Sequence, residues 1–377
     1  MTLSDRLRTV GLDAGLDEVG ICGAEPFEQA RAALEQRREQ GLHGGMQFTY
    51  RNPARSTEPA RVLDGAASLV VGAWRYPSEL PARPDGPHGR VARYATEDHY
   101  RRLRAALERV AELLHDEGHR AVVVADDNAL VDRAAAVRAG IGWYGKSSNV
   151  LLAGRGSWYV LGSVVTDAAL VAAHAPVEDG CGACTRCLQG CPTGAIVAPG
   201  VVDARRCLAW LVQADGPIPA EFREAMGDRV YGCDECQEVC APTRRSDAAV
   251  PVSLGDAGSA APGTWVALDW MLGAEDDELM ARLGRWYVPR RDPRYLRRNA
   301  LVAYGNTASG DDPSLGAVLE PYLDGDDDLL ASHAAWAALR LGREDLLLLP
   351  PRDRRAVLVE ERRRWPTEPA GDEDGRR

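Results

Sequence analysis

Eight of the nine cysteines lie in one short stretch of the chain, and crowding of this kind in a chain without an export signal points to metal ligation. The first four follow the pattern Cys-x2-Cys-x2-Cys-x3-Cys-Pro, which is the ligand run of bacterial two-cluster ferredoxins. They are Cys181, Cys184, Cys187 and Cys191. Because the fourth cysteine of such a run binds a second cluster, further ligands are expected downstream. These are Cys207, Cys233, Cys236 and Cys240.

The crossed ligation of such runs predicts two 4Fe-4S clusters with four thiolates each. The first cluster is expected on Cys181, Cys184, Cys187 and Cys240. The second cluster is expected on Cys191, Cys207, Cys233 and Cys236. Two zinc sites would use the same number of cysteines but would not explain the order of the gaps. The ninth cysteine, Cys22, ends an apolar stretch and is expected in the core.

The scaffold for these ligands has 377 residues, enough for two or three domains. Hydrophobic residues make up 45% and charged residues 27%, which is typical of a globular protein. No apolar run reaches the roughly 18 to 20 residues of a membrane span, and the N-terminus lacks the apolar segment of an export signal. We therefore expect a cytoplasmic protein with no membrane segment.

The pattern of elements predicts an α/β domain, a cluster domain and an all-α domain in sequence. Helix-like and strand-like segments alternate over 1–175, which predicts an α/β fold with a covered sheet. Residues 176–243 are expected to form a ferredoxin-like domain with the two clusters. The stretch 244–264, rich in Ala, Gly, Pro, Ser and Asp, is interpreted as a linker. Short helical pairs over 265–365 favour a HEAT-like domain, and 366–377 is expected to be a disordered tail.

Asp126 is a candidate proton donor because it follows a buried strand. In an α/β sheet, a side chain at the carboxyl end of a strand points at the crevice where ligands bind. The next two residues, Asp127 and Asn128, precede a predicted helix and are expected to cap it.

A glycine-rich segment at 140–147 matches the phosphate-binding P-loop pattern, but its context differs. A P-loop follows a strand and opens a helix, whereas this segment follows a predicted helix and runs into strands. Two other interpretations stay open: a helix end at Gly140 followed by a tight turn, or a loop that approaches a flat cofactor. The segment contains Lys146, the only lysine of the chain, where a compact ammonium is present in place of the usual guanidinium.

A basic run near the C-terminal domain contrasts with the net charge of −11. Residues 282–298 contain seven arginines and only one acid, Asp292. Such a basic patch suits contacts to nucleic-acid phosphates. The arginines are Arg282, Arg285, Arg290, Arg291, Arg294, Arg297 and Arg298. A solvated helix face would give the same pattern. The aromatic residues among them, Trp286, Tyr287 and Tyr295, could stack on bases or belong to the core.

Taken together, several segments resemble the tRNA epoxyqueuosine reductase family over nearly the whole chain. They are 93–95, 123–126, 138–146, 231–237 and 296–300, with the eight cysteines between them. The resemblance implies an N-terminal cobalamin-binding domain, two 4Fe-4S clusters and a HEAT-like domain that helps to hold tRNA. It implies reduction of epoxyqueuosine at the wobble position to queuosine, the final step of queuosine biosynthesis. It also implies an external electron donor of the flavodoxin or ferredoxin type and a monomeric enzyme.

The resemblance assigns roles to individual residues. By this resemblance, Asp126 corresponds to the family's proton-donating aspartate, and Arg51 corresponds to an arginine that contacts cobalamin. Lys146 and Gln237 fall on positions expected near the corrin or the tRNA. The arginines expected to bind tRNA are Arg290, Arg291, Arg294, Arg297 and Arg298. The chain has no Asp-x-His-x-x-Gly motif, so no histidine ligand to cobalt is expected.

Three departures from the family pattern keep other functions open. The order Asp98-His99-Tyr100 differs from the family's Asp-Tyr-His, Ala209 and Trp210 replace Ser and Tyr after Cys207, and Ala241 separates the last ligand from Pro242. A related corrinoid iron–sulfur reductase, of the reductive dehalogenase kind, is one alternative. A non-catalytic module for electron transfer or RNA binding is the other.

Overall fold

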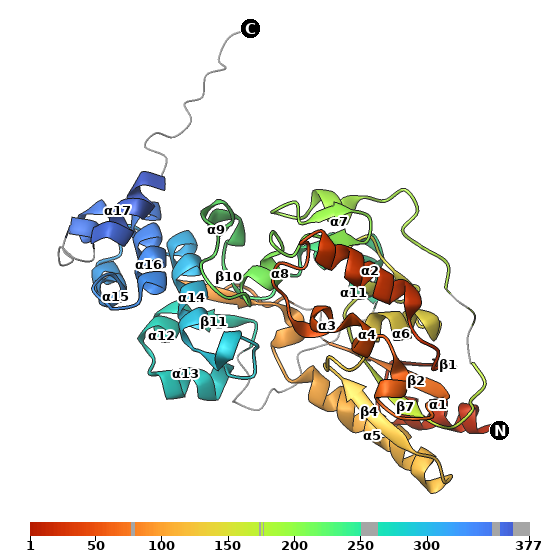
Figure 1. Cartoon of the computed structure of the whole chain (residues 1–377). Helices are drawn as coiled ribbons and strands as arrows, with labels where there is room; N and C mark the ends of the chain where they lie inside the picture. The colour runs from red at the N-terminus through yellow and green to blue at the C-terminus, as the bar shows by residue number, and fades with distance from the viewer. Residues whose placement is uncertain (77–79, 173–174, 176, 250–262, 349–354, 365–377) are drawn as a thin grey trace. The chain divides into compact units, whose positions relative to one another are not determined.

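The computed structural model describes residues 1–76, 80–172, 175, 177–249, 263–348 and 355–364 (Figure 1). Residues 250–262 of the expected linker and the expected tail at 366–377 lie outside the described residues.

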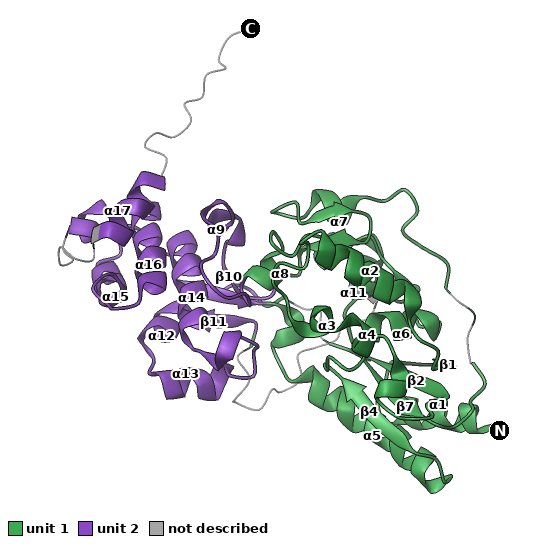
Figure 2. Ribbon diagram, in the orientation of Figure 1, with its two compact units in different colours: residues 1–81, 92–211, 233–263 green, residues 82–91, 212–232, 264–377 purple. Residues whose placement is uncertain are grey.

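The chain divides into two compact units, each built from three stretches of sequence (Figure 2). Unit 1 comprises Met1–Pro81, Ala92–Leu211 and Cys233–Gly263. Unit 2 comprises Ala82–Val91, Val212–Gly232 and Thr264–Arg377. Most of the α/β segment and all eight clustered cysteines therefore lie in unit 1. Two short stretches, Ala82–Val91 from the α/β segment and Val212–Gly232 from the cysteine-rich segment, join the helical segment in unit 2.

Unit 1 is built on a four-stranded sheet with the strand order β1-β2-β7-β4, and every pairing in it is antiparallel. The strands are β1 (Glu18–Gly23), β2 (Ser68–Arg75), β7 (Tyr159–Thr166) and β4 (Ala121–Ala125). Side chains of a strand alternate between its two faces, so Val70 of β2 joins one core while Leu69 and Val71 join the other.

Helices cover both faces of this sheet, as the sequence predicts. Helices α1 (Leu3–Asp13) and α5 (His99–Asp116) pack on one face, where the buried Leu103, Leu107 and Leu114 recur at helical spacing. Helix α6 (Asp132–Arg138) packs its three alanines on the other. The remaining helical segments of the N-terminal part are α2 (Glu28–Glu39), α3 (Phe48–Arg51), α4 (Pro53–Ser56), η1 (Pro59–Arg61) and η2 (Arg93–Ala95).

The cysteine-rich part of unit 1 consists of loops, two hairpins and short helices. The hairpins pair β5 (Trp143–Tyr144) with β6 (Val150–Leu151) and β8 (Ile196–Ala198) with β9 (Val201–Val202). The helices are α7 (Arg186–Gln189), α8 (Leu208–Leu211), α10 (Glu235–Glu238) and α11 (Ala241–Ala249). Helix α11 occupies the first part of the stretch interpreted as a linker, and Pro242 is tolerated there because it lies in the first helical turn.

Unit 2 combines a small sheet with packed helices. Its strands are β3 (His88–Val91), β10 (Arg229–Tyr231) and β11 (Trp265–Ala267), in the order β10-β3-β11. Its helices are α9 (Ala220–Met226), α12 (Leu268–Gly273), α13 (Asp276–Leu283), η3 (Pro289–Arg291), α14 (Arg294–Thr307), α15 (Leu315–Leu323), α16 (Asp328–Arg340), η4 (Glu344–Leu348) and α17 (Arg355–Arg364). Helix α14 is buried along most of its length and packs against α12 and α16.

Among the described residues, no helix has the length and apolar character needed to cross a bilayer.

Candidate functional site

The first group of four thiols lines part of a cavity of about 210 Å³ in unit 1. Its cysteines are Cys181, Cys184, Cys187 and Cys240. Cys187 lies in α7, and Cys240 immediately precedes α11. Burial raises the pKa of Cys187, and the neighbouring thiols of Cys240 and Cys181 act in the same direction. The four thiols therefore line one shared cavity.

The second group comprises Cys191, Cys207, Cys233 and Cys236. Burial raises the pKa of Cys236 well above its ordinary value, and the thiols of the other three members add to the effect. Two hydrogen bonds reach sulfur atoms of this group. The Ala195 N–H donates to Cys191 Sγ at 3.2 Å, and Asn149 Nδ2 donates to Cys236 Sγ at 3.7 Å.

Each group supplies the four thiolates that a 4Fe-4S cluster takes as ligands. A zinc ion needs its sulfur ligands to converge to about 2.3 Å from one point. In the described part of the chain, no three His, Cys, Asp or Glu side chains are arranged to hold one ion. A 4Fe-4S cluster is larger and is held by four thiolates around it. Bound iron would also supply the positive charge that keeps crowded, buried thiols ionised.

The hairpin loop 145–149, between β5 and β6, contacts both thiol groups. Lys146 Nζ donates to the carbonyls of Gly182 and Cys184, at 2.6 and 2.9 Å, in the loop of the first group. Asn149 contacts the second group through Cys236. This loop belongs to the segment that resembles a P-loop, and the structure shows a helix end at Gly140 (φ 71°) followed by a hairpin. Nucleotide binding therefore has no structural support here.

Asp126 immediately follows β4, at an edge of the sheet, with its side chain exposed. Its backbone is in the left-handed region (φ 51°), which is uncommon outside glycine but which aspartate adopts more readily than most residues. Arg104 of α5 donates to the carbonyl of Ala125 and so supports this turn. The surrounding protein desolvates the carboxyl enough to raise the pKa of Asp126; Arg104 opposes the rise, and Asp98 and Asp127 reinforce it.

Two neighbours of Asp126 at the start of α6 were not identified from the sequence. Asp132 has a buried Oδ1 with no hydrogen-bond partner among the described residues. Burial raises its pKa well above the ordinary value, and the nearby Asp126 carboxyl is the next cause. Arg133 Nη1 donates to the Ser148 carbonyl at 3.2 Å and lies near enough to Cys207 to lower the pKa of that thiol against the effect of burial. Helix α6 thus connects the Asp126 loop with the second thiol group.

Arg51 lies at the end of α3, exposed, and its side chain has no hydrogen bond or ion pair within the described ranges. The segment is anchored on both sides. Trp210 of α8 donates from Nε1 to the Gly44 carbonyl (2.8 Å) and packs edge-on against Phe48. Ser56 Oγ donates to the Asn128 carbonyl (2.5 Å) in the Asp126 loop. Trp210, one of the departures from the family pattern, therefore supports the Arg51 segment.

Gln237 and His99 are buried in unit 1. The Gln237 Oε1 accepts hydrogen bonds from Ser157 Oγ (3.0 Å) and Tyr76 Oη (3.4 Å) beside the second thiol group. The His99 ring contacts that of Tyr76, with centroids 5.7 Å apart. Both residues therefore belong to the packing behind Cys236, and Gln237 is not displayed on the surface.

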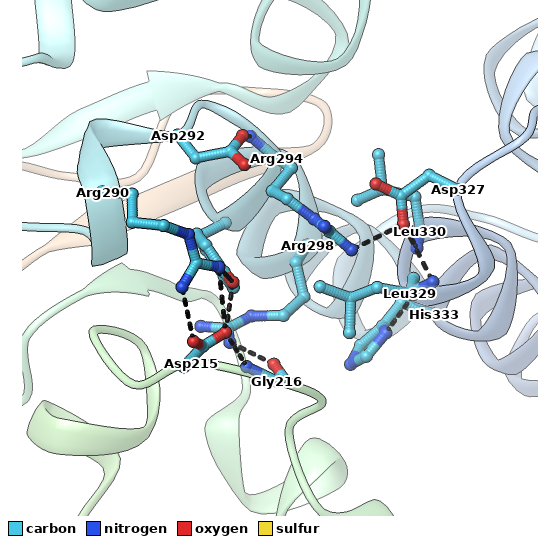
Figure 3. A network of polar contacts seen from close by, with 11 residues as sticks. Asp215, Gly216, Arg290, Asp292, Arg294, Arg298, Asp327, Leu329, Leu330 and His333 are labelled. Atoms are coloured by element: carbon cyan, nitrogen blue, oxygen red, sulfur yellow. Dashed lines mark hydrogen bonds and ion pairs between the residues drawn. The ribbon is translucent and has the colours of Figure 1, made fainter. Parts of the chain in front are cut away.

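The predicted tRNA-binding arginines lie in unit 2, and most of them are paired with acids (Figure 3). Arg290 forms an ion pair with Asp215 (2.8 Å), and Arg294 with Asp327 (2.9 Å). Arg297 pairs with Asp276. Arg291 is exposed and has no hydrogen bond or ion pair to its side chain in the described part of the chain. Arg290 and Arg291 both adopt positive φ angles, 56° and 55°, at the turn before α14.

Arg298 is a correction to the predicted set, because its side chain is fully buried. Its Nη1 donates to the carbonyls of Ala214 (2.7 Å) and Gly216 (2.6 Å), so the guanidinium holds an internal loop and is not available to a phosphate. Helical spacing explains the error: Arg298 points inward on α14 while Arg294 and Arg297 are partly exposed. Among the aromatic residues, Trp286 and Tyr295 belong to the core and Tyr287 is exposed.

Comparison with known proteins identifies the family. Residues 180–242 match the model of the 4Fe-4S double cluster binding domain. The epoxyqueuosine reductase of Vibrio cholerae is 34% identical over 354 residues, covering 89% of this chain and 91% of that protein. The epoxyqueuosine reductase of Bacillus anthracis is 32% identical and covers 87% of this chain and 86% of the relative.

Solved structures agree along nearly the full length. A crystal structure of an epoxyqueuosine reductase with a tRNA-Tyr epoxyqueuosine-modified stem loop has 28% identity and a TM-score of 0.84, covering 95% of this chain and 97% of that chain. A Bacillus subtilis epoxyqueuosine reductase, captured with an aspartate catalytic loop swung out of the active site, has 27% identity and a TM-score of 0.83, covering 95% and 98%. The resemblance predicted from the sequence is confirmed: this chain is an oxidoreductase that belongs to the epoxyqueuosine reductase family.

Proposed function

We propose that this chain reduces epoxyqueuosine at the wobble position of tRNA to queuosine, the last step of queuosine biosynthesis, with two 4Fe-4S clusters and cobalamin as cofactors. The observation that carries the proposal is the arrangement in unit 1. An acid with a raised pKa follows a strand there, and α6 and the hairpin loop connect its loop with the two four-thiol groups. Removing the epoxide oxygen takes two electrons and two protons and releases water, so it requires both an electron relay and an acid.

Each thiol group would hold one cluster, with Cys181, Cys184, Cys187 and Cys240 as the ligands of the first. Cys191, Cys207, Cys233 and Cys236 would be the ligands of the second. Electrons would enter from an external donor of the flavodoxin or ferredoxin type. Cys184 is exposed, whereas all four thiols of the second group are partly buried, which favours the first group as the one nearer to solvent.

The residues around Asp126 fit a bound cobalamin. Arg51 offers an unpaired guanidinium for an amide or phosphate of the cofactor, and the buried Asp132 Oδ1 lacks a partner that a ligand amide could supply. When bound, cobalamin would supply the low-potential cobalt that passes electrons to the epoxide. Gln237 would support the second cluster from the side of the core, through Ser157 and Tyr76.

Asp126 would protonate the epoxide oxygen as the carbon–oxygen bond breaks. A general acid must carry its proton at the working pH, and the raised pKa of Asp126 increases the protonated fraction. Its exposure lets the carboxyl exchange with water, which would return the proton and supply the second one. The left-handed backbone at Asp126 would fix the direction of the acid.

Unit 2 would bind the tRNA as a HEAT-like helical domain. Helix α14 packs against α12 and α16, and α16 also packs against α15 and α17, so the helices form one layered group that supports this description. Arg290, Arg291, Arg294 and Arg297 are the candidate phosphate contacts, and the exposed Tyr287 could stack on a base. We propose that the enzyme acts as a monomer in the cytoplasm.

The test uses the full chain, purified without oxygen and reconstituted with iron, sulfide and cobalamin. We expect about eight iron and one cobalt per chain, and conversion of an epoxyqueuosine stem-loop RNA to its queuosine form with a chemical reductant. Iron without cobalt would contradict the cobalamin assignment. Both metals without conversion of the RNA would contradict the substrate and favour another corrinoid reductase.

A further inference from the structure

The hairpin loop 145–149 is a single short segment that contacts both thiol groups. Two backbone hydrogen bonds form the turn of this loop. The Ser148 N–H donates to the Gly145 carbonyl (2.9 Å), and the Gly145 N–H donates to the Asn149 carbonyl (2.8 Å). A Cβ atom at Gly145 would lie 2.2 Å from Leu151 Cδ1, so the Leu151 side chain packs closely against this turn. The loop is therefore held in one shape.

Further contacts fix the loop to the rest of unit 1. The Gly200 N–H donates to the Lys146 carbonyl (2.9 Å), and Ser148 Oγ donates to the Gly200 carbonyl (2.8 Å). Arg133 donates to the Ser148 carbonyl. With its backbone anchored in this way, the loop can present Lys146 and Asn149 to opposite groups without moving.

Lys146 contacts the first group through two backbone carbonyls. Its ammonium donates to Gly182 and Cys184, which belong to the loop that carries the first two ligands, and it lines the same cavity as the four thiols. A positive charge beside a cluster stabilises the reduced form, which carries one more electron, and so raises the reduction potential.

Asn149 acts on the second group by a different route. Its amide donates directly to Cys236 Sγ. Hydrogen bonds to ligand sulfur draw charge from the sulfur and also raise the potential of a cluster. The two effects are of the same sign but act on separate clusters.

We propose that this loop sets the reduction potentials of the two clusters separately, through the Lys146 charge on the first and the Asn149 hydrogen bond on the second. The proposal rests on the proposed function only in requiring that both clusters are present. Lys146 and Asn149 are positioning residues in this proposal, because neither is a ligand.

The test is an EPR-monitored redox titration of the full reconstituted chain, with dithionite as the reductant. For Lys146→Met, the ratio of reduced to oxidised first cluster at the wild-type midpoint should fall on the order of tenfold, which is about 59 mV for one electron. The second cluster should be unchanged. For Asn149→Leu the second cluster should shift in the same direction and the first should stay. Lys146→Arg should keep the potential of the first cluster close to wild type, because the charge is retained.

Unchanged potentials in both variants, or equal shifts of both clusters in either one, would overturn the proposal. Weaker binding of the stem-loop RNA by Lys146→Met at unchanged potentials would also overturn it, since Lys146 would then serve the RNA. Failure to load about eight iron would instead contradict the proposed function, so the two failures are distinguishable.

A second measurement uses the fact that Lys146 is the only lysine. An amine-reactive ester can modify only Lys146 and the N-terminal amine, and mass spectrometry separates the two. Because its ammonium is engaged by the ligand loop, we expect Lys146 to react several-fold more slowly in the iron-loaded chain than in the chelator-treated chain, with the N-terminus as an internal reference. Equal rates would show that the contact to the ligand loop does not persist in the loaded protein.

Discussion

Unit 1 and unit 2 both carry charged residues marked by the sequence, but they differ in what surrounds those residues. In unit 1, Arg51 has no partner for its side chain among the described residues, and Lys146 donates only to backbone carbonyls. In unit 2, Arg290, Arg294 and Arg297 are each paired with a carboxylate. The difference teaches that a basic run in a sequence does not measure the charge offered to a ligand, because acids distant in sequence can neutralise it.

The largest expected effect is in unit 1, where one carboxyl would do chemistry. Asp126→Asn should lower turnover of the reconstituted enzyme by about 100-fold to 10,000-fold, the range for loss of a general acid. Iron and cobalt content should be unchanged, since Asp126 is not a cluster ligand. The measurement is single-turnover conversion of the epoxyqueuosine stem loop.

Asp127→Asn is the matched control for this variant. Asp127 Oδ1 accepts from the Ala129 N–H (2.8 Å), and an asparagine oxygen can accept the same bond, so activity should stay within a few-fold. The pH profile gives a further check. The pKa of Asp126 is raised, its protonated form is the active one, and turnover should therefore fall as the pH rises through that pKa. Full activity of the Asp126→Asn variant would show that Asp126 is not the proton donor.

The next effect concerns stability in unit 2, where a buried arginine serves structure. Arg298→Ala should destabilise unit 2 by about 3 kcal/mol, because the carbonyls of Ala214 and Gly216 lose charged hydrogen bonds and a buried side chain is removed. Hydrogen exchange of the α14 amides measures this locally. Arg297→Ala is the control, and its partly exposed pair with Asp276 should contribute at most about 1 kcal/mol. Similar protection in both variants would contradict a structural role for Arg298.

How much the sequence could predict depends on how local the signal is. The grouping of the eight cysteines follows from spacing within ligand runs, and the place of Asp126 from the end of one strand. The pairing of Arg290 was not predictable, because Asp215 is 75 positions away. The contacts of Lys146 reach 36 and 38 positions along the chain, so the role of the hairpin loop required the fold. Asn149 and Arg133 were missed for the same reason, although both lie close to motifs that the sequence marks.

A smaller effect separates paired from unpaired arginines within unit 2. Arg291→Gln should weaken binding of the stem-loop RNA and reduce the slope of log affinity against log salt by about 0.7 to 0.9, as expected for one lost phosphate contact. Arg290→Gln should change the slope less, because Arg290 must give up Asp215 before it can bind a phosphate. Titration of the RNA at several salt concentrations measures both. A larger change for Arg290 would mean that the Asp215 pair opens readily when RNA binds.

The smallest effect is a pH dependence of stability in unit 2 that comes from one buried histidine. His333 Nε2 accepts from the Ile218 N–H (3.2 Å), and Nδ1 donates to the Leu329 carbonyl (2.7 Å), so the ring is neutral. Burial lowers the pKa of His333 well below 6.5, and the positive charges of Arg223 and Arg298 act in the same direction. The unfolded chain therefore binds a proton below about pH 6.5 that the folded chain does not, and stability falls as the pH falls, by at most about 1.4 kcal/mol per pH unit.

His333→Gln isolates this contribution, because glutamine can accept from Ile218 and donate to Leu329 but does not titrate. We expect the exchange protection of α16 amides to fall between pH 7.5 and pH 5.5 in the wild type and to fall less in the variant, after correction for the intrinsic exchange rate. Amides of β2 and β7 in unit 1 provide the internal control and should respond alike in both proteins. The same loss of protection in wild type and variant would show that other groups carry the acid sensitivity of unit 2.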